Sequence, residues 1–519
     1  MKSRSANLSR FAITLLILSS IFGNLFPFLN IDLGFVILTP LRSLLIAVGV
    51  YSLIIWLGRF KRKEVIAALK KDYMGWCAVF FFAAWFALGA GWILFGTVSG
   101  NAVADVVGIF TAFMLAFCCF TLINTRRDVH YFLKLLVLSG VILSVLACLE
   151  LVIGNFVPGT RYYLTLEEKI KNKQTIFSPT TVFYNPNDFA AFMLLCLSLV
   201  CYCIIQANTI WKFLCYLVIA LLMVIPTVLT NSTLFNIYVV ILIVLTAVTL
   251  LLVRARTWRL RLTQVAAIAL VSILFVTFGM TGIRSTFVEL NRSYFTVQIQ
   301  KYYAQAQKPD NSTPPDQNQT EPDASAPQFP EDEASTPTEP EMIYPELPEF
   351  NTTVITNPDT LNDQLNGYQQ NYGTVHIRKW LMFAGLDYFM DSPLIGNGPD
   401  SFYEQISQDA DYLQQTRRIT NPHCFYIELL SQYGGILLAI YLGIILYLAI
   451  RSGLQAIREL RREQPGWGML CFLLVGIFSA VVFMPSSIVR FTSIWIFLIL
   501  AVCAFCKGTY PQDEEYPNT

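Results

Sequence analysis

The sequence predicts an all-α, polytopic integral membrane protein with about twelve transmembrane helices and a long external loop that carries a surface helix. Three observations support this fold class. Hydrophobic residues make up 55% of the 519 residues, charged residues only 14%, and the mean hydropathy is +0.53, whereas about 25% of the residues of a soluble domain are charged. Apolar runs of membrane-spanning length recur along the chain. Basic residues gather in every second connection between these runs.

Twelve apolar runs come close to or exceed the length of about 20 residues with which a helix crosses the hydrocarbon core. They cover residues 11–29, 34–57, 73–96, 103–123, 131–154, 187–206, 210–229, 232–253, 263–280, 424–450, 467–485 and 489–506. We therefore expect residues 1–280 to hold the first nine transmembrane helices and residues 424–506 the last three.

Basic residues predict the orientation of these helices. Lys and Arg occur in alternate connections, at residues 2–10, 59–71, 126–127, 212, 254–261, 451–462 and 507. By the positive-inside rule these connections and both termini are cytoplasmic, with residues 507–519 as a cytoplasmic tail. Among the short outer connections only Arg490 departs from the pattern. We expect a multi-pass protein of the cell membrane whose remaining connections face outward.

Two connections are large enough to carry chemistry, and both are predicted to be external: residues 155–186 and the longer loop 281–423. Within the longer loop, residues 309–350 contain ten prolines, eleven Asp or Glu, and no Lys or Arg. Such a segment has little apolar surface to bury, so we expect an acidic, Pro-rich, disordered insert that acts as a spacer.

Residues 374–407 differ from this insert because apolar side chains recur at helical spacing and are followed by the Pro- and Gly-containing stretch "DSPLIGNGPDSF". This pattern predicts an amphipathic helix on the outer surface that ends in a tight turn. The apolar positions are Ile377, Trp380, Leu381, Ala384 and Tyr388.

Two short motifs, "NPNDFAAFM" and "NPHCFYIELL", are expected to begin helices at the external face. In each, the Asn is a favoured N-cap and the Pro suits the first helical position, at Asn185–Pro186 and Asn421–Pro422. His423 would then lie in a first helical turn, where the helix dipole disfavours imidazolium and leaves the imidazole able to accept a proton. Asn187 and Asp188 would lie in the other first turn. Free N–H groups at such helix ends bind anions.

Several arginines are predicted on the same side of the membrane. Guanidinium groups keep their charge and bind phosphate through paired hydrogen bonds. Arg42 lies about two turns inside the second apolar run, a costly position unless it faces a cavity or a partner. The anion-binding candidates are Arg378, Arg284, Arg161 and Arg42. Taken singly, each could equally well anchor the chain among lipid headgroups.

These segments resemble the O-antigen ligase and polymerase-like family of membrane proteins. The resemblance lies in "NPNDFAAFM", in "IRKWLMFAGLDYFMDSPLIGNGPDSF" and in "NPHCFYIELLSQYGGILL". In the last segment the matching positions are His423, Glu428, Gly434 and Gly435, which correspond to the family's histidine, a glutamate five residues later and a glycine-containing turn. Two positions depart from the family pattern: Cys424 replaces the usual Asn, and Thr233 follows Ser232 where many relatives have Arg.

The resemblance implies a membrane glycosyltransferase of the O-antigen ligase or polymerase type. Since the loop carboxylates Asp391, Asp400, Asp409 and Asp411 are scattered and form no metal-binding cluster, we expect it to work without metal or cofactor. The donor would be a polyprenyl-diphosphate-linked saccharide, and the acceptor a hydroxyl on a glycan, lipid or wall polymer outside the cytoplasmic membrane; no nucleic acid is expected as a partner. His423 would be the general base. Glu428 would orient its imidazole or cap a neighbouring helix. The residues expected to bind substrate are Arg378, Arg284, Arg161, Arg42, Asn185, Asn187 and Asp391.

Two other classes stay open. A flippase for lipid-linked oligosaccharides can also have twelve spans, but no internal repeat relates residues 1–260 to residues 261–519. A wall-sensing scaffold would explain the acidic insert but not His423 or Arg378. Within the glycosyltransferase class, the acidic insert favours an envelope without an outer membrane, and hence a polymerase of capsule or teichuronic acid type or wall attachment.

Overall fold

The computed structural model describes residues 2–26, 29–32, 37–61, 72–96, 101–158, 160, 163, 178–230, 232–253, 258–274, 280–306, 374–462, 466–489 and 491–508. The acidic insert, Arg161 and Arg490 lie outside these residues. The chain divides into two units, residues 1–297 with 375–519, and residues 298–374. The helices that carry the candidate site belong to the first unit.

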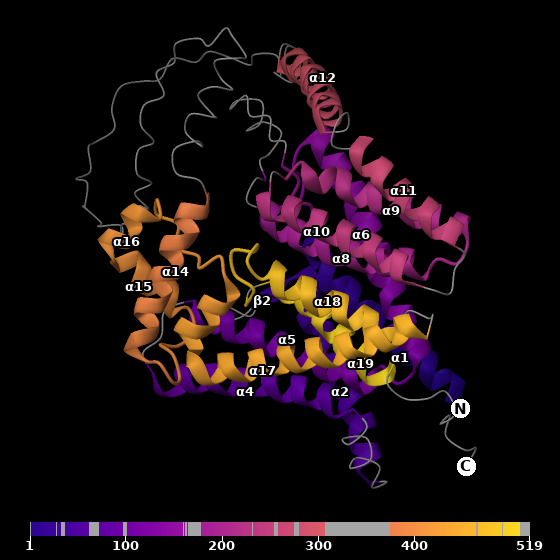
Figure 1. The fold of residues 1–519 in the computed structure, drawn as a ribbon. Helices are drawn as coiled ribbons and strands as arrows, with labels where there is room; N and C mark the ends of the chain where they lie inside the picture. The colour runs from indigo at the N-terminus through magenta and orange to yellow at the C-terminus, as the bar shows by residue number, and fades with distance from the viewer. Residues whose placement is uncertain are drawn as a thin grey trace, which may run out of the picture. The chain divides into compact units, whose positions relative to one another are not determined.

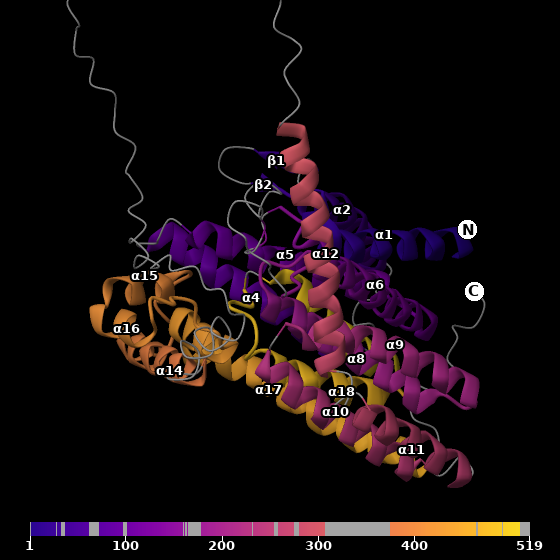
Figure 2. The same ribbon diagram turned by 90° about the horizontal axis from the view of Figure 1, so that it is seen from above.

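The regular secondary structure of the described chain is helical (Figures 1 and 2), apart from a two-stranded antiparallel hairpin of β1 (Ile31–Asp32) and β2 (Ile37–Leu38). The helices are α1 (Lys2–Phe22), α2 (Pro40–Lys61), α4 (Tyr73–Phe95), α5 (Ala102–Leu122), α6 (Arg126–Ile153), α8 (Pro186–Gln206), α9 (Ile210–Val228), α10 (Thr233–Leu252), α11 (Trp258–Leu274), α12 (Met280–Ala306), α14 (Thr374–Asp391), α15 (Ser401–Gln408), α16 (Ala410–Gln415), α17 (Phe425–Arg461), α18 (Trp467–Val481) and α19 (Trp495–Gly508), with short 3₁₀ turns η1 (Gly23–Leu25) and η4 (Thr492–Ile494).

Nine of the described helices are long and apolar enough to cross a membrane: α1, α2, α4, α5, α6, α8, α9, α10 and α17. Two shorter apolar helices, α18 and the stretch Thr492–Lys507, occupy the positions of the last two predicted spans. The predicted ninth span coincides in part with α11, which has 17 residues. The chain is therefore a polytopic, all-α membrane protein, with nine candidate spans among the described residues where the sequence predicted twelve.

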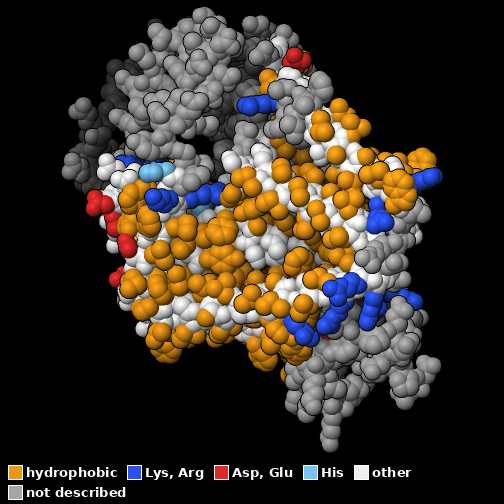
Figure 3. Space-filling view, in the orientation of Figure 1, with side chains coloured by type: hydrophobic (Ala, Val, Ile, Leu, Met, Phe, Trp, Pro, Cys, Tyr) orange, Lys and Arg blue, Asp and Glu red, His pale blue; other side chains and the backbone are white. Residues whose placement is uncertain are grey.

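Burial divides the helices into central and peripheral ones. α8 is apolar on all sides and packs against α6, α9, α10 and α18, so 94% of its apolar spanning segment is buried. In α9 and α10 only 22% and 28% of the corresponding segments are buried, as expected for helices with one face toward lipid. The space-filling view shows an apolar surface with basic and acidic side chains gathered toward its ends (Figure 3).

One end of the helices is joined by ion pairs. Arg10 of α1 pairs with Asp128 of α6 (Nε to Oδ1, 2.8 Å), and Lys507 of α19 pairs with Asp72, the N-cap of α4. Arg126 Nε also donates to Lys507 O (3.1 Å). The starts of α4 and α6 and the end of α19 therefore meet at one end, and α14–α16 lie at the other (Figures 1 and 2).

Candidate functional site

The turn that follows α14 packs against a break in α17. At Gly434 the backbone leaves helical geometry (φ 80°, ψ 174°), although helix continues on both sides. The break frees backbone groups, and the turn satisfies them through three hydrogen bonds: Asn397 N–H to Ser431 O (3.1 Å), Gly398 N–H to Gln432 O (2.8 Å) and Gly435 N–H to Pro393 O (2.8 Å). The expected glycine-containing turn at Gly434–Gly435 is thus a kink that holds the 393–398 turn.

The helix predicted within residues 374–407 is present as α14, and its apolar residues form a small core. Leu381 and Ala384 are fully buried, and Tyr388 is nearly so. They pack with Phe402 and Ile406 of α15 and with Cys424 and Ile427 at the start of α17. This core fixes α14 against the region around His423.

The prediction that Asn421 caps the helix containing His423 is wrong. α17 begins at Phe425 with Cys424 as N-cap, and His423 precedes it with φ +50°. The cause is tertiary: the His423 N–H donates to Ser486 O (3.2 Å) and the Phe425 N–H to Val482 O (3.1 Å). These bonds tie the chain to the segment after α18, residues 482–489, here called the serine loop. His423 is half-buried in a left-handed conformation that is costly for any residue except glycine.

Arg378 reaches the serine loop from α14. Its Nη1 donates to Phe483 O (2.7 Å). Burial lowers the pKa of Arg378, but an arginine so shifted still carries its charge at neutral pH. Burial also raises the pKa of the neighbouring Cys424 thiol, which is therefore neutral and does not cancel the guanidinium charge.

Glu428 binds the same loop from the first turn of α17. It is buried, its Oε1 accepts a hydrogen bond from the Ser487 hydroxyl, and its Oε2 accepts one from the Ile488 N–H (3.2 Å). Two donors on one carboxylate stabilise its charged form. Glu428 therefore holds the serine loop in place.

The predicted cap of α8 is confirmed. Asn185 is the N-cap, its side chain accepts from the Asp188 N–H (3.0 Å), and Pro186 is the first helical residue. The Asn185 amide also donates to Ser486 Oγ (3.0 Å). Asn185, Arg378, His423 and Glu428, far apart in the sequence, thus all contact the serine loop.

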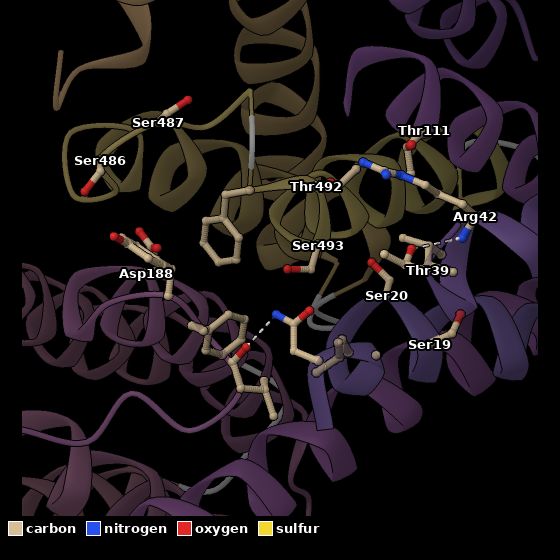
Figure 4. A pocket seen from close by; sticks show the side chains of 18 of the residues that line it. Ser19, Ser20, Thr39, Arg42, Thr111, Asp188, Ser486, Ser487, Thr492 and Ser493 are labelled. Atoms are coloured by element: carbon tan, nitrogen blue, oxygen red, sulfur yellow. Dashed lines mark hydrogen bonds between the residues drawn. The ribbon is translucent and has the colours of Figure 1, made fainter. Parts of the chain in front are cut away.

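A cavity of about 800 Å³ lies beside this loop. Its wall is rich in hydroxyl and amide side chains: Ser19, Ser20, Asn24, Thr39, Asn101, Thr111, Thr420, Asn421, Ser486, Ser487, Thr492 and Ser493. Two charged residues line it, with Arg42 on one side and Asp188, beside Ser486, on the other (Figure 4). Tyr184 and Tyr403 add exposed aromatic rings. The volume is in the range of about 300–1,000 Å³ typical of small-molecule sites.

The other predicted binding residues are distributed unevenly. Arg42 lines the cavity as expected for a costly charge inside a span. Arg284 is exposed on α12, Asp391 is exposed at the end of α14, and Asn187 is half-buried; none of the three is among the described residues that line the cavity.

The sequence analysis missed Ser486 and Ser487 and treated Asp188 only as part of a cap. The signal for the serines was weak, because "MPSSIV" appeared as a short connection between two apolar runs. Asp188 is 8% exposed, and its Oδ1 has no hydrogen-bond partner among the described residues. Buried carboxylate oxygens are normally paired, so an unpaired one on a cavity wall suggests contact with a ligand.

Comparison with known proteins adds one match. Residues 218–442 fit the sequence model of the O-antigen ligase family. This range includes α10, α14 and the start of α17, with Arg378, His423, Glu428 and the Gly434 kink. No curated protein sequence is significantly similar to the chain.

Proposed function

The chain carries an O-antigen ligase family domain at residues 218–442, and on this premise we propose that it is a glycosyltransferase of cell-surface polysaccharide biosynthesis. It takes a saccharide from a polyprenyl-diphosphate donor and transfers it to a hydroxyl of a glycan, lipid or wall acceptor at the outer face of the cytoplasmic membrane. The large loop and the α14–α16 end would then be extracytoplasmic and both termini cytoplasmic.

One observation carries the proposal: Arg378, His423, Glu428 and Asn185 all contact the serine loop, and Ser486 and Ser487 of that loop line a large polar cavity. The four residues themselves are not among the described residues that line it. Three of these four residues lie in the matched domain, whereas Asn185 and the serine loop lie outside it. Residues from separate parts of the chain that meet at one loop are expected of a site assembled by the fold. Contacts that served only to stabilise the serine loop would not need a polar cavity beside it.

The chemistry of the cavity wall suits a saccharide. Serine, threonine and asparagine side chains can both donate to and accept from sugar hydroxyls. The Tyr184 and Tyr403 rings, 61% and 43% exposed, offer apolar faces against which a sugar ring can pack. The positive charge of Arg42 on the cavity wall suits a diphosphate, and Arg378 adds a second positive charge at the serine loop.

In the mechanism, His423 accepts the proton of the acceptor hydroxyl. The acceptor oxygen forms a bond to the anomeric carbon of the donor sugar, and the bond from that carbon to the diphosphate oxygen breaks. The electron pair leaves with the polyprenyl diphosphate, whose developing charge Arg378 and Arg42 stabilise. Glu428 and Asn185 are positioning residues, because they hold the serine loop against which the His423 backbone rests.

The experiment is transfer of labelled glycan from a purified polyprenyl-diphosphate donor in liposomes. General-base catalysis contributes about 10²–10⁴ in rate, so His423→Ala should lower transfer by that factor and leave donor binding nearly unchanged. His376→Ala is the matched control. It removes a histidine from the same end of the protein, where Nε2 accepts from Trp380 Nε1 (2.9 Å), and should keep activity. A His423→Ala enzyme with wild-type turnover would refute the general-base role.

Arg378→Ala separates binding from chemistry. The loss of one charged hydrogen-bonding group should weaken donor binding by about 1.5–3 kcal/mol, measured by titration of labelled donor into detergent-solubilised protein. Arg418→Ala, at an exposed arginine, is the control and should bind the donor as the wild type does. Equal donor affinity in the Arg378→Ala and Arg418→Ala proteins would remove Arg378 from the diphosphate site.

A further inference from the structure

We propose that a second cavity, between α1, α6, α8 and α9, binds the phosphodiester headgroup of an anionic phospholipid. This cavity has a volume of about 700 Å³. It lies at the C-terminal end of α8, whereas the candidate site lies at the N-terminal end. Because α8 has 21 residues and a helix rises about 1.5 Å per residue, about 30 Å separate the two sites.

Four cations line this cavity, and only Arg10 among them pairs with a carboxylate within the described chain. Arg10 of α1, Arg127 and Lys134 of α6, and Lys212 of α9 line it, and its described lining contains no Asp or Glu. The nearby Asp128 is already engaged, since it accepts from Arg10 Nε (2.8 Å) and caps the start of α6. Within the described chain, neither Arg127 nor Lys134 pairs with a carboxylate. Like charges around one cavity repel, and a bound anion would relieve the repulsion.

The floor of the cavity is built of packed side chains. Leu133, Tyr202, Cys203 and Ala207 are all buried at its base. The Tyr202 hydroxyl oxygen accepts from Gln206 Nε2 (2.9 Å), which leaves the hydroxyl hydrogen for a ligand. A hydroxyl donor together with several cations in one cavity suits a phosphate group.

The flanks of the cavity favour a lipid over a free phosphate ester. Phe11, one residue after Arg10, is 60% exposed, and Leu138, one turn after Lys134, is 55% exposed. Leu138 lies on the same face of α6 as Lys134, so an exposed apolar side chain adjoins the cavity residues and an acyl chain can lie against it. Basic pockets between membrane helices are where anionic headgroups bind.

The test measures melting of the purified full-length protein in neutral detergent by tryptophan fluorescence. Dioctanoyl phosphatidylglycerol should raise the melting temperature in a saturable manner, because a ligand that binds only the folded state stabilises it. Dioctanoyl phosphatidylcholine should not. Glycerol phosphate, which has the charge but no acyl chain, should have no effect at equal concentration. Equal stabilisation by phosphatidylcholine or by glycerol phosphate would overturn the proposal.

The cavity variant and its control variant each lose two positive charges. Arg127→Gln with Lys134→Gln should weaken phosphatidylglycerol binding about 25-fold, since each cation near the surface contributes about fivefold. Arg458→Gln with Arg461→Gln, two exposed arginines at the end of α17 outside the cavity, should bind as the wild type does. Lys134→Arg keeps the charge and should keep the affinity.

If the double variant at Arg127 and Lys134 fails to fold, the test uses Lys212→Gln, at an exposed position. This variant should bind phosphatidylglycerol about fivefold more weakly than the wild type. Unchanged phosphatidylglycerol affinity in the cavity variant, or the same loss in the α17 variant, would show that the lipid does not occupy this cavity.

Discussion

At the scale of single residues, the candidate site depends on contacts that secondary structure does not supply. His423 adopts a left-handed conformation held by one backbone bond to Ser486, and Asp188 presents an unpaired, buried oxygen on the cavity wall. Both features cost free energy of folding, of the order of 1–3 kcal/mol each. Costs of this kind persist where function needs them, which is why both residues deserve direct tests.

Asp188→Asn tests the ligand role of the cavity wall. The amide should leave the helix cap intact, because the Asn185 oxygen accepts from the backbone N–H of residue 188 and not from its side chain. Loss of one carboxyl acceptor oxygen should weaken substrate binding by about 1 kcal/mol, seen as a raised KM in the transfer assay. The melting temperature should stay the same or rise, since the amide replaces a buried carboxyl group whose Oδ1 has no partner among the described residues.

A role of Asp188 in folding alone predicts the reverse result. The melting temperature of Asp188→Asn would then fall, and KM would stay at the wild-type value. Thr249→Val, at a buried residue of α10 that is not among the cavity residues and whose hydroxyl donates to Leu245 O (2.7 Å) in its own helix, is the control with little expected effect on KM.

At the scale of elements, the kink in α17 and the turn after α14 form one structural unit. Gly396 and Gly434 face each other's backbones: a Cβ on Gly396 would lie 2.3 Å from Gln432 O, and one on Gly434 would lie 2.3 Å from Leu394 O. Two backbones can approach this closely only where both residues are glycine. The glycines of two separate sequence motifs are therefore explained by one contact.

Gly434→Ala should disrupt this unit. Its backbone conformation is essentially restricted to glycine and costs another residue about 1–3 kcal/mol, with the clash in addition. We expect a lower melting temperature and a loss of glycan transfer. Gly443→Ala, in the same helix with no atom within 4 Å of the added methyl group, should be neutral or stabilise by about 0.5–1 kcal/mol. Similar melting of both variants would contradict the account of the kink.

At the scale of the whole molecule, the charge distribution predicts orientation. The end of the helices at which Arg10, Asp128 and Lys507 lie carries clusters of basic residues, which the positive-inside rule assigns to the cytoplasm. Cysteines introduced at Thr320 and at the exposed Arg462 should report this in intact cells, in a background where the two exposed native cysteines, Cys77 and Cys215, are serine. An impermeant thiol reagent should label residue 320 and not residue 462. Labelling of residue 462 alone would invert the orientation.

The acidic insert should be dispensable for catalysis. It lies outside the described residues, and its composition provides little apolar surface for a fixed site. Since halving a flexible loop changes its closure free energy by only about 0.6 kcal/mol, deletion of residues 310–345 should leave insertion and glycan transfer near wild-type levels. Normal membrane levels with abolished transfer would instead make the insert part of the site.

The sequence by itself determined the membrane class, the positions of most helices, α14 with its turn, and the cap at Asn185. These follow from local properties: apolar length, helical periodicity, and the side chains that suit a helix start. It also selected His423, Glu428 and Arg378, which lie in the motifs that carry the family resemblance, and Arg42, which is a costly charge inside an apolar run. It misplaced the start of α17, because Asn421–Pro422 has the local chemistry of a cap.

Only the tertiary structure decided where these residues meet. The serine loop, distant in sequence from all of them, accepts from His423 and Arg378 and donates to Glu428. Those bonds outweigh the local preference for a cap at Asn421, because a backbone group buried among helices must find a partner wherever the fold provides one. Arg42 and Asp188 line opposite sides of one cavity for the same reason: the packing of the helices that carry them, and no pattern along the chain, brings them together.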